Sequence, residues 1–259
     1  MTARSRVVVY SHSMLFYWWP VWAAGFIMAG LCFVDDQRLA VVPAGTVAKD
    51  DVLTPPKGKH LPVDPVSNEV AQPHLHTTSS KSAGVLFMTI LLVVIFSTNI
   101  PLRGLWSVIF IGTAVFLAII FALLRINEQT VWDHIIHYVS FLDIRINMGG
   151  YLFLSVGLFI IWFVVTFVFD RQICMVFTPG KVTVQQAIGD GAKVYMTGGM
   201  VVTRRRDDLF RHVILGFGSG DIVIAPAGAH EIDMPNVLFS GRRLREIEAI
   251  IKVIVAVPS

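Results

Sequence analysis

The residue types best suited to bind a metal ion lie in the middle of the chain. Asp133, His134 and His137 occur within five residues of one another, and on a helix positions three or four apart share a face, so two of them could point at one ion. A structural or catalytic zinc site needs at least three protein ligands, and the nearest further candidates are His74 and His76. No zinc-binding motif surrounds these residues. We therefore interpret His134 and His137 as flanks of an interfacial helix and expect neither a metal nor another cofactor.

A run of arginines is the candidate binding surface. Arg204, Arg205 and Arg206 are consecutive, and Arg211 follows shortly after. Near a bilayer each such residue gains about 1 kcal/mol from anionic lipid. Two aspartates directly follow the run and cancel part of its field. Two interpretations stay open: contact with an anionic lipid or an acidic partner, and a solvated turn whose charges pair with one another.

The sequence contains no motif of an enzyme. The run Gly216–Gly220 is similar to a phosphate-binding loop, but it lacks the Lys-Ser/Thr pair, and a strand rather than a helix is expected after it. We interpret it as a tight turn. The two cysteines, Cys32 and Cys174, indicate neither a disulfide framework nor a cysteine-based metal site. No nucleophile elbow or zinc-protease motif is present, so we expect a protein without catalytic residues.

The elements that must carry these residues are dominated by apolar blocks. Hydrophobic residues make up 54% of the chain and charged residues 15%, whereas soluble domains are about a quarter charged. A helix of roughly 20 apolar residues crosses a bilayer. Four uncharged blocks meet that requirement and predict four transmembrane helices, at about 14–34, 83–98, 105–124 and 151–169. Uncharged spans are atypical of ion pathways, and the first is read as a retained span, not a cleaved signal peptide.

Two segments connect the predicted spans. The loop 35–82 holds six prolines and is expected to be an extended connector with a short strand at Leu39–Val42. The segment 127–147 has apolar residues at helical spacing opposite a polar side, which predicts an amphipathic helix along the membrane surface. Trp132 and Tyr138 suit the headgroup region.

The distribution of positive charge predicts the orientation. Arg4 and Arg6 precede the first span, Arg103 lies between the second and third, and Arg171 and Lys181 follow the fourth. With four crossings these regions share one side, which the positive-inside rule makes cytoplasmic. We therefore expect a multi-pass protein of the inner (cytoplasmic) membrane with both termini inside the cell. The net charge of +3 is too small to indicate a nucleic-acid partner.

After Asp170 short alternating runs replace the apolar blocks. A hairpin is predicted at 172–177 and 181–186, and a terminal helix at 241–253. Further strands are expected at 192–197, 200–203, 209–216, 221–225 and 231–234. Antiparallel strands followed by one capping helix predict a small β-barrel or sandwich covering 170–259.

The run Arg211–Ile224, then Glu231–Val237, then the helix Arg242–Lys252 resembles the bacterial pleckstrin-homology-like (PH-like) domains that are attached to membrane spans. The resemblance covers about 170–255. It implies a curved antiparallel sheet closed by a C-terminal helix, on the cytoplasmic side, in a family whose members are mostly non-enzymatic.

The sequence thus predicts a non-catalytic, membrane-anchored scaffold or assembly protein that presents a PH-like domain at the cytoplasmic face. The alternative is an accessory subunit of a membrane transport or channel complex, because small residues in the first and third spans permit close helix contacts. The partners expected are the lipid bilayer and either another protein or a second copy of the chain. No nucleic acid or small-molecule substrate is indicated.

Overall fold

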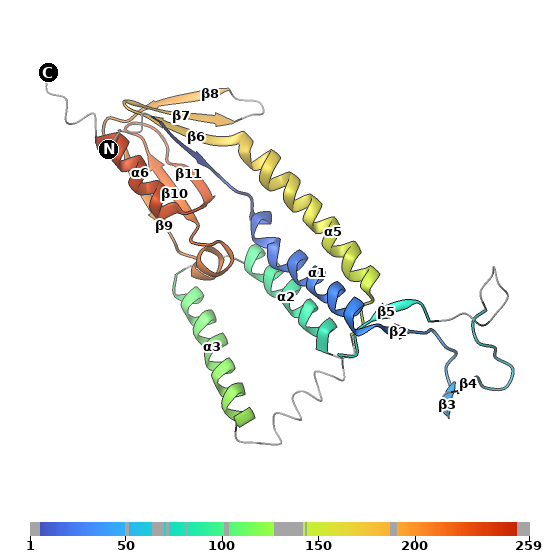
Figure 1. Cartoon of the computed structure of the whole chain (residues 1–259). Helices are drawn as coiled ribbons and strands as arrows, with labels where there is room; N and C mark the ends of the chain where they lie inside the picture. Colours follow the sequence, from blue (N-terminus) through green and yellow to red (C-terminus); the bar gives the residue numbers. More distant parts are fainter. Residues whose placement is uncertain are drawn as a thin grey trace.

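A computed structural model of the chain shows apolar helices with a small sheet domain at one end (Figure 1). The structure describes residues 6–49, 52–63, 70, 73–80, 82–100, 104–126, 142, 144–186 and 191–252. Helix α1 (Trp19–Asp35) packs against both α2 (Ser82–Asn99) and α5 (Met148–Val164). Strand β1 (Val7–Tyr10) and helix α6 (Ser240–Lys252) both belong to the sheet domain.

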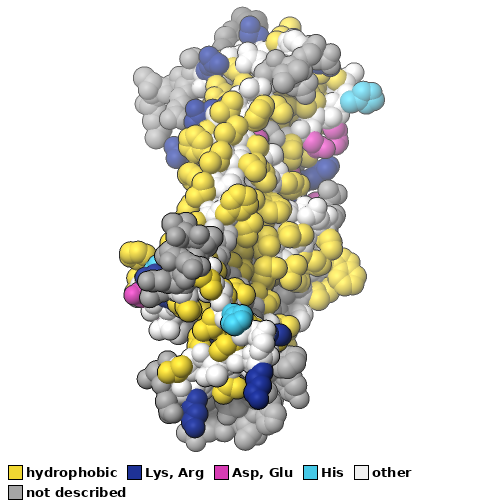
Figure 2. All heavy atoms as spheres, turned by 90° about the vertical axis from the view of Figure 1, so that its right-hand side faces the viewer, with side chains coloured by type: hydrophobic (Ala, Val, Ile, Leu, Met, Phe, Trp, Pro, Cys, Tyr) yellow, Lys and Arg dark blue, Asp and Glu magenta, His cyan; other side chains and the backbone are white. Residues whose placement is uncertain are grey.

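Three helical segments in the described part of the chain are long and apolar enough to cross a membrane: Met14–Asp35, Ser82–Asn99 and Met148–Gln172. The first comprises the 3-10 turn η1 (Met14–Trp18) and α1 (Trp19–Asp35), and the second is α2 (Ser82–Asn99). The third comprises α5 (Met148–Val164), η2 (Val165–Phe169) and η3 (Asp170–Gln172). Figure 2 shows hydrophobic side chains covering the middle of one face, with Lys and Arg above and below. The spans expected at 14–34, 83–98 and 151–169 are therefore confirmed as apolar helices of spanning length.

A close contact between the helices depends on a glycine. A Cβ at Gly25 would collide with the hydroxyl of Ser155 and would meet the Phe87 ring at 3.2 Å. Glycine at this position therefore lets α1 approach α5 and α2. The buried side chains around this contact include Met28, Phe87 and Tyr151, and the rings of the last two meet edge to face at 5.2 Å.

The third predicted span forms helix α3 (Leu105–Ile126). Its apolar part, Leu105–Ile120, is shorter than the three segments described above. Figure 1 shows α3 diverging from α1, α2 and α5, and near its start the Phe110 ring stacks on the Phe96 ring of α2 with centroids 5.6 Å apart. The amphipathic helix expected over 127–147 falls mostly outside the described residues. Its described end, 144–147, is not helical; there Asn147 caps α5 by accepting a hydrogen bond from the Gly150 N–H at 2.8 Å.

The proline-rich loop contains two small antiparallel pairs. Strand β2 (Gln37–Leu39) pairs with β5 (Leu75–Thr77), and β3 (Val47–Lys49) pairs with β4 (Val52–Thr54). The strand expected at Leu39–Val42 is therefore placed too late. It begins at Gln37 because Asp36, with a left-handed φ of 46°, ends α1 and turns the chain directly into β2.

The sheet domain consists of two antiparallel sheets and a helix. The strands that follow the last membrane helix are β6 (Ile173–Thr178), β7 (Lys181–Gln186), β8 (Ala192–Met196), β9 (Val201–Arg205), β10 (Gly220–Ala225) and β11 (Ile232–Val237), and the helix is α6 (Ser240–Lys252). One sheet has the order β1-β6-β7-β8 and the other β11-β10-β9. The hairpin, the strands around 192, 200, 221 and 231, and the terminal helix are confirmed to within a few residues.

The first sheet takes a strand from the N-terminal end of the chain. Strand β1 (Val7–Tyr10) pairs with β6, so that Val7 lies opposite Phe177 and Val9 opposite Met175. Val7 and Val9 are buried. The domain expected to span 170–259 therefore also contains residues that precede the first membrane helix.

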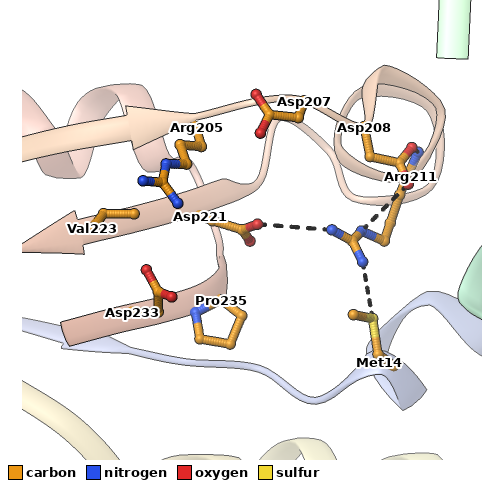
Figure 3. Close-up of a pocket in the computed structure, with 9 residues that line it drawn as sticks. All are labelled: Met14, Arg205, Asp207, Asp208, Arg211, Asp221, Val223, Asp233 and Pro235. Carbon is orange, nitrogen blue, oxygen red and sulfur yellow. Dashed lines mark hydrogen bonds and ion pairs between the residues drawn. The ribbon is translucent and has the colours of Figure 1, made fainter. Parts of the chain in front are cut away.

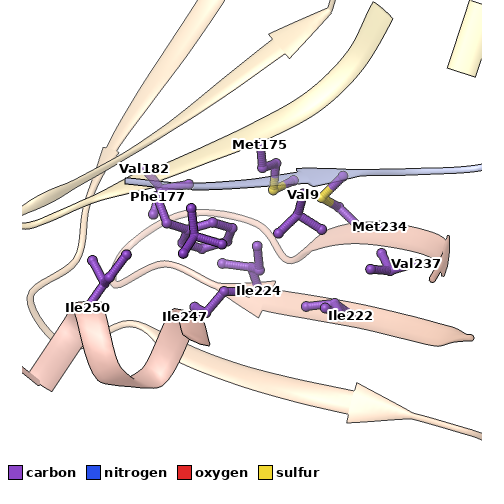
Figure 4. Close-up of a cluster of buried hydrophobic side chains, with 11 residues drawn as sticks. Val9, Met175, Phe177, Val182, Ile222, Ile224, Met234, Val237, Ile247 and Ile250 are labelled. Carbon is purple, nitrogen blue, oxygen red and sulfur yellow. The ribbon is translucent and has the colours of Figure 1, made fainter. Parts of the chain in front are cut away.

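The domain core lies between the two sheets and α6 (Figure 4). Every element around it except β8 and β9 contributes a fully or nearly fully buried side chain. These are Val7, Val9, Met175, Phe177, Val182, Ile222, Ile224, Met234, Val237, Ile247 and Ile250. The residues that enter this core alternate along β1, β6 and β10, as expected for side chains on one face of a strand, and Val176 and Val223 on the opposite faces are buried as well.

The strand expected at 209–216 is wrong: Phe210–Leu215 forms a turn of π-helix, η4. Its buried side chains are Arg211, His212 and Leu215, a helical spacing and not an alternation. Groups from outside the segment stabilise its start. The Asp208 carboxylate accepts the Arg211 N–H at 2.9 Å, and the Ser107 hydroxyl of α3 accepts those of Leu209 and Phe210 at 3.0 and 3.2 Å.

Candidate functional site

A cluster of hydrogen-bonded polar side chains lies where the first membrane helix meets the sheet domain. The segment between β1 and α1 is bound to the domain from both sides. The backbone Ser13 N–H and the His12 ring contact the Asp170 carboxylate at 3.1 and 3.2 Å, and the Asn236 side-chain amide donates to the His12 carbonyl at 2.8 Å. The Trp19 indole donates to the Leu215 carbonyl at 2.9 Å.

The centre of this junction is the hydroxyl of Tyr17. It donates to Asn236 Oδ1 at 2.9 Å and lies 3.0 Å from Ser219 Oγ and 3.4 Å from His212 Nδ1. Tyr17, His212 and Ser219 are fully buried, and Asn236 is 1% exposed. We call these four residues the Tyr17 network. It joins the turn before α1 to η4, to the loop before β10 and to β11.

The loop 216–220 makes room for this network. A Cβ on Gly216 would press against the Tyr17 ring and the Ser219 hydroxyl. The loop leads into β10 and not into a helix, as expected from the sequence. Its glycines therefore serve packing at the junction, which agrees with the interpretation as a tight turn.

Beside the network lies a cavity of about 310 Å³ with charged walls (Figure 3). Asp207, Asp208, Asp221 and Asp233 line it together with Arg205 and Arg211. Arg211 is 6% exposed, and its guanidinium lies 3.8 Å from both the Asp208 and the Asp221 carboxylates and 3.3 Å from Met14 Sδ. Arg211 pairs with two of the four aspartates and also contacts Met14, so it links the domain to the N-terminal segment within a lining that carries an excess of negative charge.

The surroundings of Asp221 in that cavity favour its charged form. Partial burial disfavours its charge, but the His212 imidazole, the Asn236 N–H at 2.9 Å and Arg211 outweigh that effect and lower the pKa of Asp221 below its usual value. Asp221 therefore gives Arg211 a negative partner at neutral pH.

The structure divides the four arginines expected from the sequence between two places. Arg211 and Arg205 line the acidic cavity, and Arg205 also pairs with Glu231 at 3.6 Å. Arg204 and Arg206 line a different, open cavity of about 510 Å³. Two further arginines complete its walls, Arg242 and Arg245 of α6. We call this second cavity the basic pocket.

The sequence predicts no role for Arg242 and Arg245, because they belong to the polar face of a helix. The signal that could have identified them is the density of arginine in the helix Ser240–Lys252, which contains Arg242, Arg243 and Arg245. Only the tertiary fold, which sets the start of α6 beside β9, brings them to Arg204.

The metal-ligand hypothesis concerns residues that are mostly outside the described part of the chain, since Asp133, His134 and His137 are not described. His76 is described and lies 3.4 Å from the Asp36 carboxylate. Among the residues that the structure describes, no group of three or more His, Cys, Asp or Glu side chains is placed to hold a metal ion.

Comparison of the chain with protein-family models, with curated proteins and with solved structures finds no match. Fold and site together define a protein with several helices of membrane-spanning length and a small two-sheet domain that is bound tightly to them.

Proposed function

We propose that the chain crosses the membrane four times, and that α3 is a span in addition to α1, α2 and α5. Strand β1 precedes α1, and strand β6 follows α5. Because the two strands pair, they lie on the same side of the membrane, which supports an even number of crossings between them. The start of α3 is bound to the domain, where the Gly104 N–H donates to the Asp207 carbonyl at 2.7 Å. Helix α5 begins at the far end of the bundle (Figure 1). The chain must therefore cross once between 107 and 148, and the 22 residues of α3 extend over about 33 Å, enough for a bilayer.

The charge bias of the flanking segments places the sheet domain and both termini at the cytoplasmic face of the inner membrane. Labelling with a membrane-impermeant maleimide tests this topology. Val47→Cys on β3 and Val194→Cys on β8 replace valines that are 62% and 58% exposed. We expect Val47→Cys to react in intact cells and Val194→Cys only after permeabilisation. Reaction of both under the same condition contradicts the crossing by α1, and the reverse pattern contradicts the orientation.

We further propose that the protein is a non-catalytic scaffold or assembly protein that presents a PH-like domain. Two antiparallel sheets closed by α6 support the PH-like identification. The observation that supports the scaffold function is the junction between the domain and the helices. The domain is bound to α1, α3 and α5 by the pairing of β1, by the Tyr17 network and by the hydrogen bonds that the Ser107 hydroxyl accepts at the start of η4. A domain held in a fixed orientation suits the presentation of a surface to a partner.

The edge strand β8 is the surface that this proposal assigns to assembly. Val194 is 58% and Met196 is 76% exposed on it, and it ends the four-stranded sheet. Exposed edge strands pair readily with another chain. The partner is a second copy of the chain or another protein.

Mass measurement after gentle detergent extraction, at native expression, tests the assembly. We expect a mass above that of the monomer for the wild type. Val194→Lys should reduce it to the monomer, because a charged edge blocks strand pairing. Val47→Lys, which makes the same change at the other end of the molecule, should not. A monomeric wild type would contradict the scaffold function.

One observation favours the second candidate, an accessory subunit of a transport or channel complex. On α3 the small residues Gly112, Ala114 and Ala118 are all exposed, and a Cβ at Gly112 would meet nothing within 4 Å. Small residues are the usual contact points between membrane helices. If Gly112→Leu reduces the extracted mass and Val194→Lys does not, this second function replaces the first.

A further inference from the structure

Two phenylalanines of the sheet domain occupy unfavourable positions. Phe217 is 56% and Phe239 is 60% exposed, and their backbones are left-handed, with φ of 50° and 49°. Bulky side chains rarely adopt this conformation, and where they do the position is functional more often than elsewhere. Both residues line the basic pocket.

The polar lining of that pocket is a set of arginines. Arg204, Arg206, Arg242 and Arg245 surround it, and none of its described lining residues is acidic. Arg242 pairs with Glu246, outside the lining, at 3.1 Å. The Nε and Nη2 atoms of Arg204 are buried and have no hydrogen-bond partner among the described residues. Unsatisfied donors of this kind call for an acceptor that the described residues do not supply.

The pocket lies at the level where the first span begins. The Phe217 ring stacks on the Trp19 ring with centroids 5.4 Å apart, and Trp19 is the first residue of α1. Tryptophan at the end of a span marks the boundary between headgroups and hydrocarbon. Val213 and Ile214 of η4, which precedes Phe217 in the chain, are also about half exposed, at 49% and 50%.

We propose that the basic pocket binds the phosphate of an anionic phospholipid from the membrane that the helices cross. The arginines hold the phosphate oxygens, for which the guanidinium fork is well matched. Phe217 and Phe239 insert beside the acyl chains, which gives their exposure a physical reason. A phosphate ion from solution would use the arginines alone and would leave the phenylalanines in water.

Lipid binding by the full-length protein, measured by native mass spectrometry from a neutral detergent, tests the proposal. Phosphatidylglycerol and phosphatidylcholine are titrated in parallel, since they differ in headgroup charge. We expect the first phosphatidylglycerol to bind more tightly than the first phosphatidylcholine. Inorganic phosphate in large excess should not displace it, because the acyl chains contribute to binding.

A pair of matched variants on one helix separates the pocket from general surface charge. Arg245→Gln removes a lining arginine, whereas Arg243→Gln removes a neighbour that pairs with Glu246 at 3.0 Å and does not line the pocket. We expect Arg245→Gln to weaken phosphatidylglycerol binding about fivefold and to weaken phosphatidylcholine binding less, because the choline cation offsets the charge of that phosphate. Arg243→Gln should match the wild type.

A third variant tests the phenylalanines without endangering the fold. Phe239→Asn removes the ring and introduces a residue that tolerates a left-handed backbone. It should weaken the binding of both lipids. The proposal is overturned by equal binding of the two lipids, by equal losses in Arg243→Gln and Arg245→Gln, or by displacement with inorganic phosphate. Unchanged binding by Phe239→Asn would overturn the insertion of that side chain. None of these outcomes depends on whether a protein partner binds β8.

Discussion

The Tyr17 hydroxyl should control how firmly the N-terminal segment is held to the sheet domain. Tyr17→Phe keeps the ring and removes the group that donates to Asn236 Oδ1 at 2.9 Å. The Asn236 oxygen then stays buried without that donor. Leaving such an acceptor unsatisfied costs about 1–3 kcal/mol. Each 1.4 kcal/mol is a factor of ten, so the segment with β1 should open about 5 to 150 times more often.

The free thiol of Cys174 reports this opening. It lies on β6 directly opposite Tyr10 of β1 and is buried in the closed state. Burial also raises the pKa of the Cys174 thiol, against a smaller lowering by Arg6, which slows its reaction further. In a Cys32→Ser background, the rate of modification by a thiol reagent then follows the population of the open form when opening and closing are fast.

We expect Tyr17→Phe to accelerate modification of Cys174 by the factor given above. Tyr195→Phe on β8, which removes a hydroxyl outside the Tyr17 network, is the control and should match the wild type. Combining Tyr17→Phe with Ser219→Ala should give less than the sum of the two effects, because the two hydroxyls contact one another at 3.0 Å. A Tyr17→Phe protein that reacts no faster than Tyr195→Phe would refute the role given to the hydroxyl.

Two further predictions concern the helix bundle and pH. Gly25→Val should lower the thermal midpoint of unfolding in detergent, because overpacking costs about 1–3 kcal/mol. Gly30→Val should leave the midpoint unchanged, because a Cβ there meets nothing within 4 Å. Equal midpoints for the two variants would contradict the close approach at Gly25. The lowered pKa of Asp221 means that its charge stabilises the fold above the unfolded value of about 4, and that this contribution is lost as pH falls through the folded pKa. The thermal midpoint of the wild type should therefore fall on acidification below about pH 4. The midpoint of Asp221→Asn should fall less, and that of the control Asp233→Asn should fall as much as the wild type. Parallel falls in all three proteins would exclude Asp221 as the cause.

Among the predictions from sequence, those for the arginines were the least complete. A run such as Arg204–Arg206 indicates that this part of the chain is positively charged, but it does not indicate which way each side chain points. Neighbouring residues on a strand face opposite sides, and β9 indeed puts Arg204 toward the basic pocket and Arg205 toward the acidic cavity. The remaining arginines of the basic pocket come from α6, roughly forty residues later in the sequence.

The segment 209–216 shows the opposite failure, in which local propensity favours the wrong structure. Its Val, Ile and Phe residues are typical of strands. The groups that stabilise the start of a helical turn here include Ser107, about a hundred residues earlier. No pattern within the segment contains that contact.

The amino-acid sequence alone determined the apolar helices, the sheet hairpin and the terminal helix. Each of these follows from hydrophobic content or periodicity over a short window, which is a local property. The tertiary structure decided that Val7–Tyr10 belongs to the sheet domain, that Tyr17 joins the first span to that domain, and that four arginines surround one pocket. These depend on contacts between residues up to about two hundred positions apart, and the energies that select them arise only when the chain is folded.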